Sequence, residues 1–311
     1  IQNLALTTNN CGYDVDYDNA GNYYVYGGSG PFLVSKYSPL GVLIWTFQGY
    51  LLSPSWPADY LNSKKASNFV VEKITEKIYI GEGPVISGAK VIRLDQNGMY
   101  DNFIAGTSSL CEIWDMGFNC NDGSLFGLGG STGGAIVNDK SGIAIDTSSG
   151  AVTPQNFTGL TTAQQDVVCH AIDPSGVIFY LFTSNQTTAI DNCLMKGNSS
   201  FNGNTWIVPS TYSNFVEAQV KHYPGLGLIS YSSNGYNALV VNSSYLFFYD
   251  GYNLAAYDKT SGNKIGSIVL SLQTALVQGG IAVDECNNIY VGGNGVIRCF
   301  NFDGTNFIEN G

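Results

Sequence analysis

The sequence predicts an all-β fold built from repeated four-stranded antiparallel sheets. The clearest repeat is the last one, where two alternating apolar runs, 280–284 and 288–293, flank a short polar turn. A third run over 296–302, the turn Asp303-Gly304 and a fourth run over 305–308 complete it. Alternating runs broken by Asn, Asp and Gly are typical of β-hairpins. Because one such sheet cannot bury its faces alone, a restated four-strand unit indicates a β-propeller.

The first full copy has the same layout. Strands are expected at 13–18, 22–27, 32–37 and 42–47, and Asn19-Ala-Gly21 supplies the first turn. Residues 1–12 could add a lone strand that closes the ring. No helical period of useful length competes with this pattern.

The later copies are less regular. The second, third and fourth begin near Asn68, Asp115 and Val167, a weaker copy begins at Asn214, and another at Asn237. The copies thus start near 13, 68, 115, 167, 214, 237 and 280. One interval is only 23 residues long and marks a truncated or misassigned blade. We therefore expect seven blades, with six as the alternative.

The composition indicates an exported protein. Charged residues make up 12% of the chain, against roughly 25% in average proteins, so amides, hydroxyls and phenols keep it soluble, as in many extracellular β proteins. The net charge of −11 and the pI near 4.4 argue against nucleic acid or an anionic membrane surface as a partner. The most apolar stretch, 265–277, is interrupted by polar residues, so direct membrane insertion is not expected.

Seven cysteines favour an oxidising compartment, and the odd number leaves at least one unpaired within the chain. A strand over 112–119 would hold Cys111 and Cys120 roughly 30 Å apart, which is too far for a disulfide. Cys286 and Cys299 lie within one blade and form the preferred candidate pair. With only two histidines and no Cys-x-x-Cys motif, a zinc site is not expected.

Two segments resemble a known family. Asp16-x-Asp18-x-x-Gly21-Asn22-x-Tyr24-Val25-x-Gly27, followed by Lys36-Tyr37-Ser38-x-x-Gly41-x-x-Ile44-Trp45, is similar to the bacterial seven-bladed β-propeller repeat. The closing Val283-Asp284-x-Cys286-x-Asn288-Ile-Tyr-Val-Gly resembles blades in large secreted surface proteins of gliding and related bacteria. The resemblance implies a propeller used for binding or display, often inside a longer adhesin-like chain. This chain ends just after a blade, which leaves open that it is a fragment of such a protein.

Calcium is the one candidate cofactor. Asp14, Asp16 and Asp18 stand at alternate positions, as at the opening of a calcium loop. The sixth position is Asn19 rather than Gly, and no acidic residue closes the twelfth. On a strand the three carboxylates would point to one face and could line the central channel. The alternative is a hairpin turn in which Asp and Asn side chains accept backbone hydrogen bonds.

No catalytic residue is assigned from the sequence. His170 lies on an inner-strand pattern and could face the channel, although a lone histidine is more often structural. A rival interpretation combines His170 with Asp14 and Asp16 in a channel-rim enzyme of lyase or glycan-hydrolase type. The chain has only Arg93 and Arg298, which excludes the three-arginine site of sialidases.

The connection 48–67 is the most unusual segment. At 20 residues it is longer than most connections in compact domains, and long ordered loops tend to be functional. Tyr50, Trp56 and Tyr60 could offer aromatic platforms to a sugar ring or a partner protein. The alternative is that Trp56 and the prolines beside it cap the adjacent blade.

The sequence therefore predicts a single propeller over 1–311 that serves as a non-enzymatic binding or display module of an exported or cell-surface bacterial protein. Expected partners are a surface protein, a glycan or other domains of a longer chain. The alternatives are the channel-rim enzyme and a structural spacer that binds nothing. Because propeller sites assemble from residues distant in sequence, the pattern alone does not identify the ligand.

Overall fold

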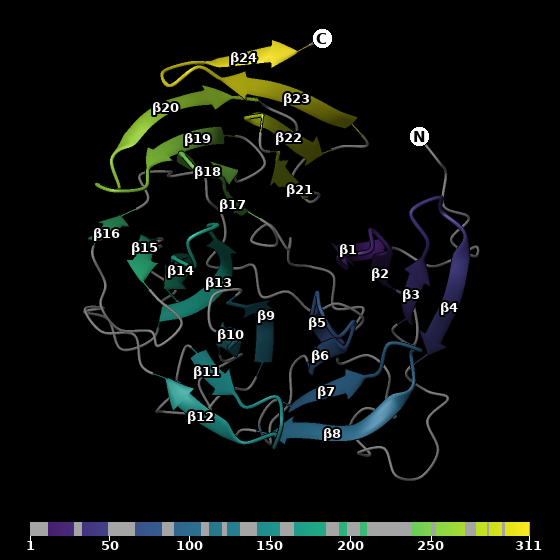
Figure 1. Cartoon of the computed structure of the whole chain (residues 1–311). Coiled ribbons are helices and arrows are strands. Elements are labelled where there is room, and N and C mark those ends of the chain that lie inside the picture. Colours follow the sequence, from purple (N-terminus) through teal and green to yellow (C-terminus); the bar gives the residue numbers. More distant parts are fainter. Residues whose placement is uncertain are drawn as a thin grey trace.

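A computed structural model of the chain shows six four-stranded antiparallel sheets arranged as blades around a central axis (Figure 1). It describes residues 12–27, 33–48, 66–82, 90–106, 112–119, 123–130, 142–155, 165–184, 193–197, 206–209, 238–249, 253–270, 278–284, 286–293 and 296–310. The strands of each sheet are paired in sequence order, so every blade is a meander. This arrangement confirms the all-β propeller that the repeats predict.

The strands of the first three blades have the following bounds. Blade 1 contains β1 (Gly12–Tyr17), β2 (Tyr23–Gly27), β3 (Leu33–Tyr37) and β4 (Leu43–Gln48). Blade 2 contains β5 (Ala66–Val71), β6 (Ile78–Glu82), β7 (Lys90–Leu94) and β8 (Tyr100–Gly106). Blade 3 contains β9 (Glu112–Phe118), β10 (Leu125–Gly130), β11 (Gly142–Ile145) and β12 (Val152–Gln155).

The other three blades follow the same plan. Blade 4 contains β13 (Gln165–Ile172), β14 (Ile178–Ser184), β15 (Cys193–Gly197) and β16 (Trp206–Pro209). Blade 5 contains β17 (Leu239–Val241), β18 (Tyr245–Tyr249), β19 (Asn253–Asp258) and β20 (Lys264–Val269). Blade 6 contains β21 (Gln278–Val283), β22 (Asn288–Gly293), β23 (Val296–Phe302) and β24 (Phe307–Asn310). None of the described segments forms a helix with the length and hydropathy that crossing a membrane would require.

The described residues thus form six blades, the smaller of the two numbers that the sequence left open. The copy expected to start at 214 lies outside the described residues. Blades 4 and 5, on either side of it in sequence, share one apolar cluster that includes Phe179 and Leu194 of blade 4 and Leu246 and Phe248 of blade 5. These two blades are therefore direct neighbours in the ring.

At the first hairpin turn of a blade, an acidic or amide side chain accepts hydrogen bonds from backbone N–H groups that have no backbone acceptor. Oδ1 of Asp18 accepts hydrogen bonds from the N–H groups two and four residues later, at 2.9 and 3.0 Å. Gly21 completes this turn in the left-handed region, with φ 79°, where glycine is favoured. Asp284 repeats the arrangement, with Asn287 in the glycine's place at φ 63°. The Asp and Gly spacing seen in the sequence is therefore turn chemistry.

The apolar core lies between the blades rather than within them. Tyr24 and Tyr26 of β2 are fully buried against blade 2, where Tyr26 stacks on Phe69 with ring centroids 5.6 Å apart. The other face of β2 is also covered, since Val25 is 9% exposed. Because both faces of such a strand are buried, its sequence is a nearly continuous apolar run.

The outermost strand of a blade has one unpaired edge, and most of these strands carry a feature that disfavours pairing with another chain. In β4 the register shifts so that Lys36 and Tyr37 pair with Trp45 and Leu43, which leaves Ile44 as a bulge. Register shifts also interrupt β8 and β20. Strands β12 and β16 contain Pro154 and Pro209.

Candidate ligand site at the centre of the ring

The innermost strands of the six blades converge at the centre of the ring (Figure 1). Described residues from all six blades line a cavity of about 470 Å³. We call it the hub cavity. Strands β1, β5, β9, β13, β17 and β21 each supply residues that lie just before the first hairpin turn of their blade. Representative lining residues, one from each blade, are Asp16, Val71, Gly117, His170, Val240 and Ala282.

The wall of the hub cavity is mostly apolar. Val70, Met116, Ile172, Val241 and Ile281 come from five different blades and present hydrocarbon surface to it. A concave site of this kind, with a few polar groups at fixed places, is the usual form of a small-molecule site. The polar groups therefore decide what the cavity can do.

One of these polar groups is the carboxylate of Asp16, and the fold neutralises it. Its Oδ2 accepts the N–H of Val71 on the neighbouring blade at 2.8 Å, and its Oδ1 accepts the N–H of Tyr17 at 2.8 Å. Lys73 forms an ion pair with Oδ1 and donates to the carbonyl of Tyr17 at 2.5 Å. The lysine Nζ also lies 3.9 Å from the centroid of the Tyr17 ring, within range of a cation–π contact. Asp16 and Lys73 thus join blades 1 and 2 and leave little net charge at the cavity.

The second polar group is the imidazole of His170. Its Nδ1 lies 2.5 Å from Oδ2 of Asp115 on the neighbouring blade, and the same oxygen accepts the backbone N–H of His170 at 2.7 Å. Oδ1 of Asp115 accepts the N–H of Met116 at 2.8 Å. The carboxylate therefore holds the imidazole in one orientation across the junction between blades 3 and 4.

Gly117 makes room for that imidazole. A Cβ atom built on Gly117 would lie 2.3 Å from Nε2 of His170 and 2.8 Å from Cζ of Phe126. The Phe126 ring meets the imidazole edge-on, with centroids 5.0 Å apart. Any side chain at 117 would have to displace one of these rings, so the glycine is part of the site.

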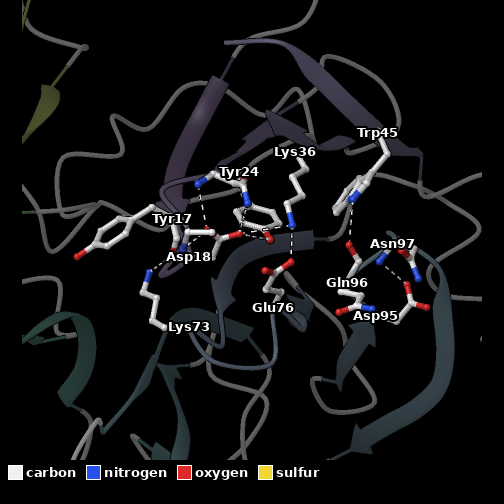
Figure 2. A network of polar contacts seen from close by, with 12 residues as sticks. Tyr17, Asp18, Tyr24, Lys36, Trp45, Lys73, Glu76, Asp95, Gln96 and Asn97 are labelled. Atoms are coloured by element: carbon white, nitrogen blue, oxygen red, sulfur yellow. Dashed lines mark hydrogen bonds and ion pairs between the residues drawn. The ribbon is translucent and has the colours of Figure 1, made fainter. Parts of the chain in front are cut away.

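Asp18 lies away from the hub cavity, in the junction between blades 1 and 2, and is 1% exposed. Its Oδ2 accepts hydrogen bonds from Nδ2 of Asn22 at 2.9 Å and from the hydroxyl of Tyr24 at 3.0 Å. Nζ of Lys36 lies 3.4 Å from that oxygen and 2.6 Å from Oε2 of Glu76 on blade 2 (Figure 2). This buried network joins the first hairpin of blade 1 to the first hairpin of blade 2.

The network fixes the protonation of its members. Burial opposes the charge on Asp18, but hydrogen bonds from Asn22 and Tyr24 and the charge of Lys36 lower its pKa. Burial also opposes the charge on Lys36, but the hydrogen bond to Glu76 and contacts with Tyr24 raise its pKa. Burial raises the pKa of Tyr24 to about 12. At neutral pH the carboxylate and the amine are therefore charged and the phenol is neutral.

A third contact joins the same two blades at their rim. The indole N–H of Trp45 donates to the carbonyl of Gln96 at 3.1 Å (Figure 2). The indole covers Gly98, where a Cβ atom would lie 2.7 Å from the ring. Trp45 of the family-like motif is thus a packing residue between blades.

The structure does not gather Asp14, Asp16 and Asp18 around one point. Asp14 accepts the N–H of Val15 at 2.8 Å, Asp16 pairs with Lys73 at the cavity, and Asp18 belongs to the Lys36 network. Within the described ranges, no group of three or more His, Cys, Asp or Glu side chains is arranged to hold a metal ion. Asp16 and His170 do share the hub cavity, as the channel-rim interpretation supposes, but Asp14 is not among its lining residues.

The other predicted site residues have different outcomes. Tyr50, Trp56 and Tyr60 lie outside the described residues, so the aromatic loop stays a prediction. Cys286 and Cys299 are free cysteines in the structure, and the disulfide suggested for them stays a prediction. Cys286 lies in the first turn of blade 6, where its carbonyl accepts a hydrogen bond from Asn301 at 3.5 Å. Cys299 lies two residues before Asn301 in β23, which is roughly 7 Å of extended strand.

Tyr17, Lys73, Asp115 and Gly117 are the site residues that sequence reasoning missed. Each meets its partner across a blade junction, 55 to 57 positions away in the case of the Asp16, Lys73 and His170 contacts. The sequence offered one signal for these pairs, which is that the two partners are separated by about one repeat length. The register between neighbouring blades, which decides which side chains meet, cannot be read from the repeat.

Comparison with known proteins supports the fold and nothing finer. No family model and no curated protein matches the chain. Among solved structures it is similar to the C-terminal WD40 domain of Sif2, with a TM-score of 0.54 and 8% identity over 98% of this chain and 86% of that one. It is also similar to a gluconolactonase from Xanthomonas campestris, with a TM-score of 0.54 and 9% identity over 93% of this chain and 84% of that one. These likenesses identify the chain as a β-propeller.

Proposed function

We propose that the chain is a binding module that takes its ligand in the hub cavity. The observation that carries this proposal is the cavity itself, about 470 Å³ in volume and lined by the inner strands of all six blades. Small-molecule sites in proteins span roughly 300–1,000 Å³. Because every blade contributes to the wall, the ring holds the site rigid and preformed.

The charges at the cavity favour binding over catalysis. Both carboxylate oxygens of Asp16 are engaged, by Lys73 and by two backbone N–H groups, rather than directed at a ligand. Glycan hydrolysis by two carboxylates needs a free acid and base that face each other across the bond. Among the lining residues that the structure describes, Asp16 alone carries a carboxylate.

The second candidate function is an enzyme that uses His170 as a general base. The observation in its favour is the hydrogen bond between Nδ1 of His170 and Asp115, since catalytic imidazoles are often oriented by a carboxylate. One structural neighbour is a gluconolactonase and the other is a WD40 domain, so the fold is compatible with either function. The binding proposal is preferred because no nucleophile, metal cluster or second free carboxylate accompanies His170 among the described lining residues.

The finer assignment belongs to the same proposal. The resemblance of the first and last blades to repeats of secreted, adhesin-type proteins of gliding bacteria supports a module of an exported or cell-surface protein. The low content of charged residues, 12%, supports the same location. Its partners would then be a surface protein, a glycan, or other domains of a longer chain.

The proposal is tested by filling the cavity. Ala282 lines the hub cavity and is exposed, so Ala282→Trp places an indole in the opening without disturbing a buried contact. Ser267→Trp adds the same side chain at an exposed position of β20, on the outer rim, and serves as the matched control. Ligands are sought by NMR with a fragment library and by a glycan array with and without calcium.

We expect Ala282→Trp to weaken each hit at least tenfold and Ser267→Trp to leave it within about twofold. Hits that bind both variants equally would place the ligand elsewhere and overturn the proposal. Conversion of a hit into product during the NMR measurement, lost in His170→Ala, would establish the enzyme instead.

A further inference from the structure

The polar atoms around the hub cavity are almost all paired, and the exceptions define the ligand. Asp16 and Lys73 satisfy each other and the backbone beside them. Two side-chain atoms of the described wall have no hydrogen-bond partner among the described residues: Nε2 of His170 and the hydroxyl of Tyr17. These two residues come from blades 1 and 4, which are three blades apart in the ring of six.

The contact with Asp115 fixes what Nε2 can do. An ionised carboxylate only accepts hydrogen bonds, so Nδ1 of His170 carries the proton that it shares with Asp115. In the neutral imidazole the other nitrogen, Nε2, then has a lone pair and no proton. Asp115 therefore presents His170 to the cavity as a hydrogen-bond acceptor.

The position of the acceptor depends on Gly117. Nε2 lies over this glycine, at 2.3 Å from the place that a Cβ atom would take, and both residues line the cavity. The imidazole is held from the other sides by Asp115 and by the edge of Phe126. His170 keeps 12% of its side chain exposed, so the acceptor is reachable but cannot turn freely.

Tyr17 supplies the second unpaired group. It is 63% exposed, and its ring points away from the Lys36 network, with Lys73 at its face (Figure 2). A phenolic hydroxyl can both donate and accept a hydrogen bond. The cavity thus offers one acceptor, one hydroxyl and an apolar wall.

We propose that the hub cavity binds a largely apolar small molecule bearing a hydroxyl group that donates to Nε2 of His170, such as an alkylphenol. This inference rests on the proposed function. A hexose fits poorly, because its several hydroxyls would face Val70, Ile172 and Val241, and each buried hydroxyl without a partner is costly. An inorganic anion also fits poorly, because the charge of Lys73 is already matched by Asp16.

The test compares three probes on the full chain at pH 8: 4-propylphenol, its methyl ether 4-propylanisole, and methyl α-glucopyranoside. Calorimetry gives the affinity, and the NMR signal of the Met116 methyl group, which lines the cavity, shows where each probe binds. The ether lacks the hydrogen-bond donor of the phenol and carries one extra methyl group, whose apolar surface favours binding of the ether. A tighter phenol therefore reports the hydrogen bond. We expect the phenol to bind roughly 3- to 10-fold more tightly, the value of one neutral hydrogen bond.

In His170→Leu the preference for the phenol should disappear, because the acceptor is gone and the apolar wall remains. Ser267→Trp, at an exposed position of β20 outside the cavity, should keep the preference. The circular dichroism spectrum of His170→Leu shows that this variant remains folded. An ether that binds as tightly as the phenol would overturn the inference, as would a glucoside that shifts the Met116 signal more than the phenol does. Either result leaves the hub cavity as the binding site, whereas loss of the proposed function would show in the Ala282→Trp comparison.

Discussion

Gly117 of β9 and His170 of β13 lie face to face across the junction of blades 3 and 4, and the imidazole occupies the space that a side chain at 117 would need. The hydrogen bond from His170 to Asp115 depends on this arrangement, since it places the ring over the glycine. A glycine in the middle of a strand lowers its intrinsic stability. Here that cost is offset by a contact that joins two blades and shapes the hub cavity.

The first prediction is that Gly117→Ala destabilises the protein. The added methyl group would meet Nε2 of His170 at 2.3 Å, so the imidazole has to leave its bond with Asp115. Overpacking together with a lost hydrogen bond should lower the free energy of unfolding by about 1–3 kcal/mol. Urea unfolding followed by tryptophan fluorescence measures the change.

Gly106→Ala is the matched control, because the nearest atom to its added Cβ, Cγ of Lys90, lies 3.8 Å away. Its stability should stay within about 0.5 kcal/mol of the parent. Equal loss of stability in both variants would mean that the space over Gly117 is not needed for the imidazole.

The second prediction concerns the buried charge of Lys36. Its side chain is 6% exposed and bridges Asp18 and Glu76. Lys36→Met keeps the aliphatic stem but leaves Asp18 buried without its cation, which should cost about 3–5 kcal/mol. Thermal and urea unfolding check this, and Lys264→Met at an exposed position provides the comparison with an expected change below about 0.5 kcal/mol. A Lys36→Met variant as stable as Lys264→Met would show that the network is dispensable.

Most of the strand order could be predicted where the repeat is regular. In blade 1 the sequence predicts strands at 13–18, 22–27, 32–37 and 42–47. Each observed strand end lies within one residue of the predicted one. The reason is physical, since an Asp or Asn that accepts backbone N–H groups and a glycine with positive φ mark each turn. Blades 3 and 4 were harder, because their outer strands β11, β12, β15 and β16 are only four or five residues long.

The site could not be predicted in the same way. The sequence pointed to His170 and Asp16 as channel residues, because both lie on predicted inner strands, which border the central channel. It grouped Asp18 with Asp16, although Asp18 follows the end of β1 and turns into the blade junction. The partners that set their chemistry, Lys73 and Asp115, lie on neighbouring blades. Only the packing of one blade on the next brings these side chains together.

The third prediction is a loss of stability at high pH that depends on Tyr24. Its pKa is raised to about 12 in the fold, against roughly 10 in the unfolded chain. The neutral phenol is therefore favoured by folding, and this contribution, on the order of 2–3 kcal/mol, is complete below pH 10 and lost as the pH rises toward 12. The raised pKa of Lys36 acts in the same direction. At the acid end, the lowered pKa of Asp18 removes stability as the pH falls below about 4.

Tyr24→Phe separates the contribution of the phenol from the rest. The variant should be less stable than the parent at pH 8, because Asp18 loses the hydroxyl as a donor. The difference should shrink as the pH rises from 9 to 12, since only the parent then has a phenol at position 24 to ionise. Unfolding free energies measured across this range check it, and a difference that stays constant with pH would contradict the assignment.

The fourth prediction is that calcium leaves the melting temperature unchanged. Asp16 and Asp18 already accept hydrogen bonds from Lys73 and Tyr24 respectively, and each has further donors around it. A calcium ion would need six to eight oxygen ligands and would have to break these contacts. Differential scanning calorimetry in EDTA and in millimolar calcium provides the measurement. A rise with calcium that is abolished in Asp14→Asn would restore the calcium loop suggested by the sequence.

The last prediction separates the cysteines by reactivity. Cys286 is exposed and free, whereas Cys169 is buried, and burial raises the pKa of its thiol well above the usual range. Since the thiolate is the reactive form, iodoacetamide at pH 8 should modify Cys286 within minutes in the native protein and Cys169 only after unfolding. Peptide mass spectrometry without reduction locates the modified residues. A peptide pair joined through Cys286 and Cys299 would instead show that the disulfide suggested by their place in one blade does form. Cys286 would then be protected from iodoacetamide in the native protein, and the behaviour of Cys169 would be unchanged.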